Sequence, residues 1–241
     1  MNMDDLQEFA QSGRFIPGIY NYCDRWCERC SMSSRCLVFA MDRELYPDQE
    51  SADIRNAAFW EKLAELLHET TELLRKRAEE EGIDLDSITS TDPDEEELRR
   101  EAARNHACSV MAKRYADMAQ AWLDHMTTED GHTVPSGHTV SLQEALDVIR
   151  WYQHQIYIKV MRALESDWDE QAGSMGEIPD DTSVQAKIAL MGIDRSIAAW
   201  GVLRKHTSVS DDDLLDLMVH LDRLRRSVEQ VFPHARSVIR P

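Results

Sequence analysis

The sequence contains little glycine, little proline and few basic residues. Its 241 residues include 9 Gly and 7 Pro, too few for the turns of a β-sandwich or for glycine-rich nucleotide loops. Lys and Arg total 27 against 45 Asp and Glu, and the resulting net charge of −18 repels phosphate backbones. We therefore expect no nucleic-acid partner for this acidic protein.

Long apolar runs are also missing. No stretch approaches the ~18 apolar residues that a membrane span needs, so we expect no membrane partner. The segment Met1–Gln11 is acidic and lacks the apolar core of a signal peptide, which predicts a cytoplasmic location. The hydrophobic share of 42% is nevertheless sufficient for a buried core, so we expect a globular protein.

Apolar residues recur at three- and four-residue steps along most of the chain after residue 50, which is typical of amphipathic helices. Gly82 is placed to end the first of these helices, and Asp92-Pro93 to begin the second. The pattern predicts five helices, over about residues 52–82, 92–126, 141–165, 182–205 and 211–231.

No stretch after residue 50 alternates like a strand, and no internal repeat is evident. We therefore predict an all-α fold, an elongated antiparallel bundle of about five helices. In this prediction residues 1–50 form a Cys-rich segment with a metal-binding loop. Residues 51–241 form the helical bundle, and both parts make one compact unit.

Four of the five cysteines lie within fourteen residues, with the spacing C-x3-C-x2-C-x5-C: Cys23, Cys27, Cys30 and Cys36. In a reducing compartment such a cluster more often binds metal than forms disulfides. Thiolates crowded on so short a loop repel one another unless a cation holds them together. The spacing therefore predicts that these four cysteines are metal ligands.

Two kinds of metal centre fit this ligand set. An iron–sulfur cluster such as 4Fe-4S uses four cysteines, commonly separated by gaps of two to five residues on one loop. Structural zinc also accepts four cysteines, usually as two C-x2-C pairs, and only one such pair is present. Tyr22 and Trp26 would shield either centre from water. The sequence thus favours a metal-binding protein with a redox role, with a zinc-stabilised interaction scaffold as the alternative.

Polar residues interrupt the apolar faces of the helices predicted over 141–165 and 182–205. Seven of them would face each other: Tyr152, Gln155, Lys159, Arg162, Lys187, Asp194 and Arg195. We expect Asp194 to pair with Lys159 or Arg162 in a buried network that fixes helix register. The alternative is an enzyme that binds a small molecule in this polar pocket of the bundle core.

Motifs of known catalytic chemistry are missing. The sequence contains no G-x-S-x-G, no G-x-x-x-x-G-K-[ST] and no H-E-x-x-H, and Glu65-x-x-His68 has no second copy that would complete a di-metal site. Whether the protein is an enzyme therefore stays open. A protein partner, a second copy of the chain and a small-molecule ligand stay open as well.

The segment Phe15–Tyr22 and the cysteine loop together resemble the opening of uncharacterised bacterial helical proteins of similar length. The likeness extends to Trp151-Tyr152 and to 194–200. No activity is attached to that group, so the resemblance implies no function. The first three cysteines also resemble the motif of radical S-adenosylmethionine enzymes, but those enzymes need an α/β barrel that the predicted helices cannot build. The part of the cysteine loop from Cys27 to Cys36 is similar to segments that hold auxiliary iron–sulfur clusters in other enzymes.

Overall fold

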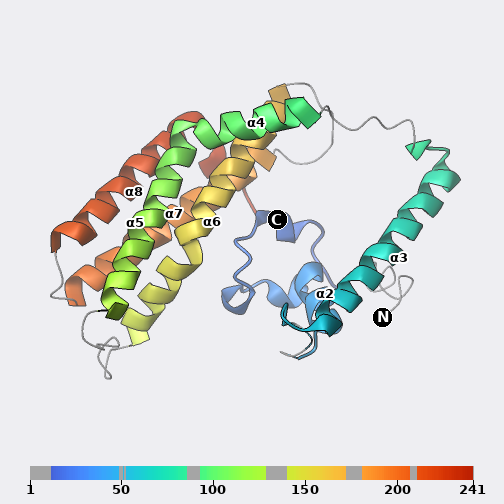
Figure 1. Cartoon of the computed structure of the whole chain (residues 1–241), viewed down its shortest axis with the longest axis horizontal. Helices are drawn as coiled ribbons and strands as arrows, with labels where there is room; N and C mark the ends of the chain where they lie inside the picture. Colours follow the sequence, from blue (N-terminus) through green and yellow to red (C-terminus); the bar gives the residue numbers. More distant parts are fainter. Residues whose placement is uncertain are drawn as a thin grey trace. The chain divides into compact units, whose positions relative to one another are not determined.

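The computed structural model describes residues 12–48, 51, 53–85, 93–128, 140–171, 181–206 and 211–240 (Figure 1). Every regular element in these ranges is an α-helix or a 3-10 helix, and none is a strand. This confirms the all-α prediction for the described residues. Within the same ranges, no helix combines the length and the apolar character needed to cross a lipid bilayer.

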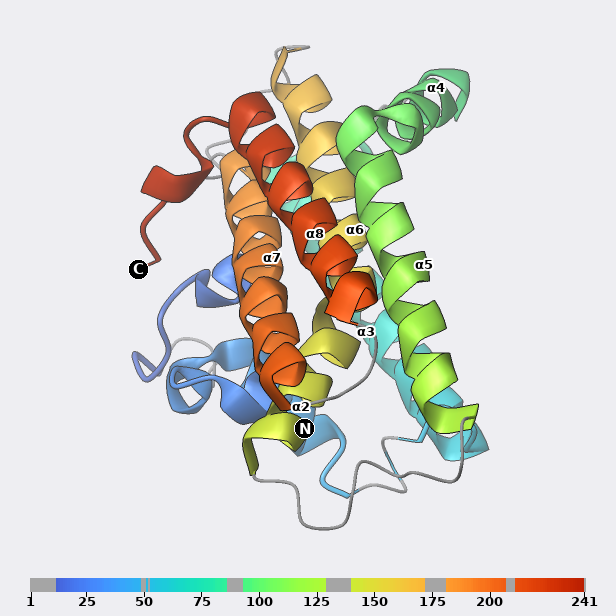
Figure 2. The same cartoon turned by 90° about the vertical axis from the view of Figure 1, so that its left-hand side faces the viewer.

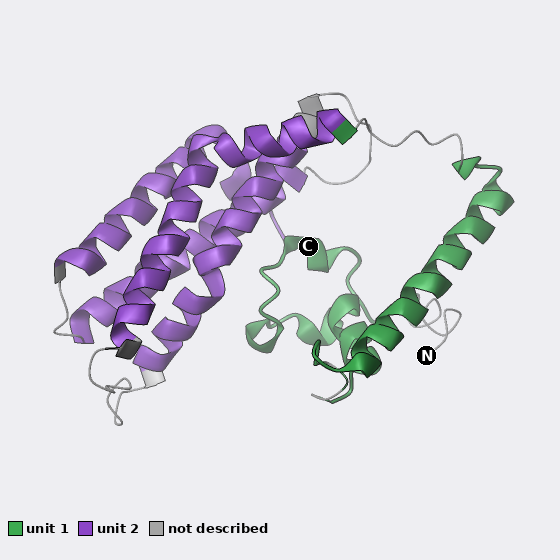
Figure 3. Cartoon of the chain, in the orientation of Figure 1, with its two compact units in different colours: residues 1–93, 241 green, residues 94–240 purple. Residues whose placement is uncertain are grey.

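The chain divides into two compact units (Figure 3). Unit 1 comprises residues 1–93 with Pro241, and unit 2 comprises residues 94–240. The sequence pattern predicted a boundary near residue 50 and one compact whole. The structure instead groups the first long helix with the cysteine segment. Residues 49, 50 and 52, at the predicted boundary, lie outside the described residues.

The described part of unit 1 begins with a β-turn. Pro17 and Gly18 occupy its centre, Gly18 has the positive φ of 67° that a type II turn needs, and the Ile19 N–H donates to the Ile16 carbonyl at 3.4 Å. Short elements follow: η1 (Ile19–Tyr22), η2 (Cys27–Arg29), η3 (Ser33–Arg35) and α2 (Leu37–Leu45).

Helix α3 (Ala57–Glu81) has well-defined ends. The Asn56 side chain caps its start by accepting a hydrogen bond from the Ala58 N–H at 3.1 Å. Gly82, at φ 70°, ends it, and the Ile83 N–H donates to the Ala78 carbonyl at 2.8 Å, as in a Schellman motif. The predicted stop at Gly82 is therefore confirmed.

Unit 2 is a bundle of helices around one core. It contains α4 (Pro93–Asn105), α5 (Ala107–Thr128), α6 (Val140–Gln171), α7 (Asp181–His206), α8 (Asp211–Val231) and η5 (Ala235–Ser237). Helices α5 and α6, α6 and α7, α7 and α8, and α8 and α5 pack against each other, and Figure 2 shows these four side by side. The five-helix prediction for residues 51–241 therefore holds only in part, because its first helix belongs to unit 1.

The helix predicted over 92–126 is interrupted at His106. The His106 Nδ1 accepts a hydrogen bond from the Cys108 N–H at 3.2 Å and so caps the start of α5. Figure 1 shows α4 and α5 meeting at an angle. Because of this break, Tyr115 and Trp122 are buried, whereas Leu98 on the same predicted stripe is 64% exposed.

The core of unit 2 holds hydrogen-bonded aromatic side chains. The Trp200 Nε1 donates to the Tyr115 hydroxyl at 3.1 Å, and the Trp122 ring meets the Trp200 ring edge-on at 5.0 Å. Burial raises the pKa of Tyr115, because the phenolate would lose its hydration there. More than half of α7 is buried, as its apolar sequence predicted.

Gly192 sets the approach of α6 to α7. A Cβ atom at this position would lie 2.8 Å from the Tyr152 Cδ1 and 3.1 Å from the Ile156 Cγ1. Only glycine leaves room for these side chains, so the residue permits the close packing of the two helices.

Candidate metal centre

Each of the four predicted ligands sits at the end of a short turn. Cys23 follows η1, Cys27 opens η2, Cys30 closes η2, and Cys36 both closes η3 and precedes α2. The Cys30 N–H donates to the Cys27 carbonyl at 3.2 Å. The four cysteines therefore lie at the ends of a succession of single turns between Ile19 and α2.

All five cysteines of the chain are thiols, and the four in this loop are half-buried. The pKa of Cys27 is raised first by burial and then by the charges of Cys23, Cys36, Glu28 and Cys30. Burial and these nearby charges disfavour the thiolate of Cys27. Among the described residues, no group of three or more His, Cys, Asp or Glu side chains is arranged to hold a metal ion.

The backbone between the first two cysteines adopts an unusual conformation. Arg25 has a φ of 60°, in the left-handed region that costs a residue with a Cβ atom roughly 1 kcal/mol. The Asp24 carboxylate accepts a hydrogen bond from the Trp26 N–H at 3.2 Å and stabilises the turn. The Arg29 guanidinium lies 4.2 Å from the centre of the Trp26 ring. Trp26 and Tyr22, which the sequence predicted to shield the centre, are both half-buried.

The fifth cysteine belongs to the core of unit 2. Cys108 is almost fully buried, and burial raises its pKa to about 11. It is therefore a protonated thiol at neutral pH and packs like a small apolar residue.

The pairing predicted for Asp194 is wrong. Its carboxylate binds Arg236 at 2.6 Å, with Arg225 at 3.7 Å, and contacts neither Lys159 nor Arg162. The reason is the register of two antiparallel helices. Arg195 on α7 lies level with Tyr152 on α6, and Lys159 is about 10 Å farther along α6.

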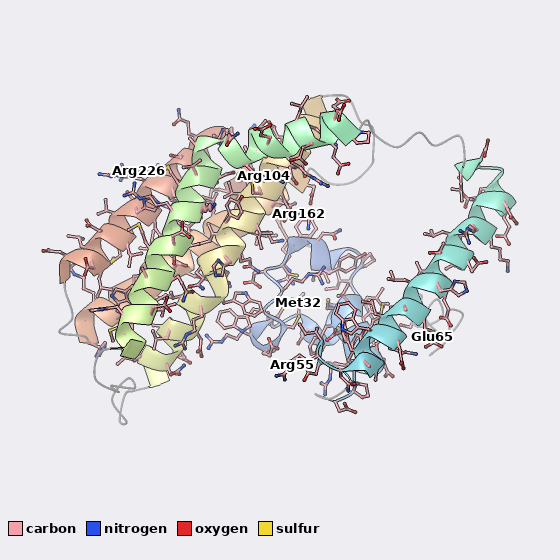
Figure 4. All side chains as sticks on the ribbon, in the orientation of Figure 1. Met32, Arg55, Glu65, Arg104, Arg162 and Arg226 are labelled. Carbon is pink, nitrogen blue, oxygen red and sulfur yellow. The ribbon has the colours of Figure 1, made fainter. Side chains whose placement is uncertain are left out.

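The remaining polar residues of α6 and α7 make separate local contacts. Lys159 donates to Gln185 at 2.8 Å, Arg195 donates to the Tyr152 hydroxyl, and Lys187 donates to the carbonyl of Val238. Gln155 is half-buried, and the side chains of Arg162 and Arg195 are exposed. The seven predicted residues therefore do not converge on one site in the structure. Arg162 is labelled in Figure 4.

The structure also contains a pocket that the sequence analysis did not identify. It has a volume of about 410 Å³ and lies between α5 and α8. Its lining residues are Met118, Ala121, Trp122, His125, Asp213, Asp216 and Leu217. The two walls are too far apart in the chain for any local spacing to reveal the pocket.

Comparison with protein-family models, with curated proteins and with solved structures finds no match for this chain. An assignment of function therefore depends on the residues and their surroundings. Of the features described above, the cysteine loop has the most specific chemistry.

Proposed function

We propose that the protein binds a metal centre through Cys23, Cys27, Cys30 and Cys36. The observation that carries the proposal is the placement of four half-buried thiols at the ends of successive short turns on one loop. Thiolates are strong ligands for zinc and for iron–sulfur clusters. The raised pKa of Cys27 adds support, since a cation would relieve the repulsion that its neighbours exert.

The scarcity of buried side chains around the loop also supports a metal. In residues 12–48 only Phe15 and Ile19 are buried, and α2 contributes no buried residue. A segment of this size gains too little from apolar burial to offset the entropy of ordering its backbone. Small segments of this kind are commonly stabilised by a structural metal or by disulfides, and here the cysteines are thiols.

The charges of the loop suit an anionic centre. Three arginines, Arg25, Arg29 and Arg35, lie between or beside the cysteines, against two acidic residues. The negative charge of four thiolates exceeds the positive charge of a zinc ion or of an oxidised 4Fe-4S core by two, so the complete centre is anionic. In a chain with a net charge of −18, these arginines supply nearby positive charge for that centre.

An iron–sulfur cluster is our first choice, because the gaps of three, two and five residues follow the crowded pattern of cluster loops. Such a cluster supplies one-electron transfer, which would give the protein a redox role. Tyr22 and Trp26 would limit the access of water and so influence the potential.

Metal analysis of anaerobically purified full-length protein tests the proposal. We expect stoichiometric iron and sulfide, and a brown colour that bleaches with dithionite. Stoichiometric zinc in a colourless protein would support the cysteine site, but it would indicate a structural role and exclude the redox role. Protein with neither metal would overturn the proposal. Cys30→Ser should abolish metal retention, whereas Cys108→Ser, the same change outside the loop, should not.

A further inference from the structure

The pocket between α5 and α8 belongs to unit 2 alone, and Figure 2 shows the two helices side by side. Its volume of about 410 Å³ lies within the range of small-molecule sites, roughly 300–1,000 Å³. On α5 the lining residues run from Met118 to His125, and on α8 from Asp213 to Leu217. Within each helix they recur at steps of three and four residues, so each wall is one face of a packed helix.

The inner part of the pocket is apolar and well ordered by its neighbours. Trp122 is 6% exposed and Leu217 is 2% exposed, so both belong to the core as well as to the pocket wall. The Trp122 ring meets the Trp200 ring edge-on at 5.0 Å, a contact that restrains its orientation. Met118 is half-buried and adds a thioether, which makes favourable contacts with aromatic rings. An aromatic body would therefore gain free energy by leaving water for this wall.

Trp122 also contributes a hydrogen-bond donor that is not used within the fold. Its Nε1 is buried and has no hydrogen-bond partner among the described residues. The neighbouring indole differs in this respect, because the Trp200 Nε1 donates to the Tyr115 hydroxyl at 3.1 Å. A buried indole N–H usually has a partner, since burial without one costs the hydrogen bond that the group makes with water. An acceptor atom on a bound molecule would satisfy the Trp122 donor.

The α8 side of the pocket is acidic. Asp213 and Asp216 are both exposed and lie three residues apart, on the same side of the helix. His125 of α5 is the third residue with a titratable side chain in the lining, and none of the described lining residues is Lys or Arg. In a chain with a net charge of −18, two carboxylates at the pocket attract a cation and repel an anion.

We propose that this pocket binds a small aromatic amine. The aromatic body lies against Trp122 and Met118, the protonated amine lies beside Asp213 and Asp216, and an oxygen atom accepts the hydrogen bond of the Trp122 Nε1. The apolar wall, the unused donor and the acidic side each specify one part of this ligand. The inference is independent of the proposed metal centre, because the pocket lies in unit 2 and the four cysteines lie in unit 1.

Titration calorimetry of the full chain with tyramine tests the ligand class, because this probe joins an aromatic ring, a protonated amine and a phenol oxygen. At about 0.15 M salt we expect a dissociation constant below about 1 mM. Two analogues each lack one group: phenethylamine lacks the oxygen, and 4-ethylphenol lacks the amine. Each should bind about 5-fold more weakly or worse. Absence of tyramine binding at about 1 mM, or equal affinities for the three probes, would overturn the inference.

Paired variants test whether the probe occupies this pocket. Asp216→Asn should weaken tyramine binding by about 5-fold or more and leave 4-ethylphenol binding unchanged, because only tyramine carries the amine. Asp212→Asn, the same change at an exposed α8 residue outside the lining, is the matched control and should bind tyramine as the wild type does.

Trp122→Phe keeps a ring but removes the N–H, so tyramine should lose more affinity than phenethylamine. Thermal unfolding should show that each variant is folded. Equal losses in Asp212→Asn and Asp216→Asn would overturn the inference, because general attraction to an acidic chain would then explain the binding. Tyramine binding that neither pocket variant weakens would overturn it as well.

Discussion

The two units of this protein differ in how much each buries. Among the described residues, the only buried side chains of unit 1 are Phe15, Ile19 and Ala78, whereas α5 to α8 of unit 2 enclose a continuous core. Unit 2 therefore has the apolar burial that ordinarily stabilises a domain. Unit 1 has a row of thiols and an exposed helix face instead. Apolar burial alone is therefore a weaker source of stability for unit 1 than for unit 2.

The difference does not lie in the supply of apolar residues. Helix α3 contains leucines and a tryptophan at regular helical spacing, but it leaves them at its surface. In unit 2 the corresponding side chains meet those of neighbouring helices, as Tyr115 and Trp200 do. Unit 1 is accordingly the part of the molecule where we place the proposed metal centre.

Loss of the proposed metal should have the largest effect and should affect only unit 1. If the proposal holds, Cys27→Ser should raise amide hydrogen exchange throughout residues 12–48 to nearly unfolded rates, because the metal would supply stabilisation that apolar burial does not. Exchange in α5 to α8 should not change. Hydrogen exchange read by mass spectrometry measures both units at once.

The matched control for that experiment is Cys108→Ala, which should loosen unit 2 and leave residues 12–48 protected. Protection of residues 12–48 that persists in Cys27→Ser would remove the contrast between the two units. The apolar contacts of unit 1 would then be sufficient by themselves.

A methyl group added to the core of unit 2 should have the next largest effect. Gly192→Ala should lower the free energy of unfolding by about 2 kcal/mol, because the new Cβ meets Tyr152 at 2.8 Å. Gly201→Ala is the control on the same helix, where the nearest atom lies 3.8 Å away, and it should stabilise by up to about 1 kcal/mol. Urea titration followed by tryptophan fluorescence measures both. Equal effects would show that α6 and α7 are not closely packed at Gly192.

Loss of the surface ion pair should have the smallest effect. Asp194→Asn should cost unit 2 less than about 1 kcal/mol, because Asp194 and Arg236 are both substantially exposed and water screens their attraction. Thermal unfolding at low and high salt measures it, and the difference from wild type should shrink as salt rises. A much larger loss of stability would mean that Asp194 contributes more to the free energy of unfolding of unit 2 than its exposure indicates.

Several elements could be predicted because their signals are local. The helix predicted over 211–231 coincides with α8, and the predicted helix end at Gly82 is that of α3. Each depends on residues within one or two turns of the chain, whose backbone preferences do not require a distant partner.

Other features depended on contacts that no local pattern encodes. The break at His106 requires that its ring nitrogen accept a hydrogen bond from Cys108, although the apolar periodicity continues through it. Asp194 binds Arg236, 42 residues later, because the η5 segment that follows α8 packs against α7. The cysteine spacing proposed a ligand set. It could not predict how many apolar side chains would surround it.

The order of residues therefore decided where most helices begin and end, and which short loop concentrates the sulfur ligands. Capping, turn and periodicity signals act over a few residues, so they can be recognised from the sequence alone. The partners of Asp194 and the exposure of α3 were decided only when the helices packed. Burial and ion pairing are relations between residues remote in the chain, and their free energies depend on distances that folding alone establishes.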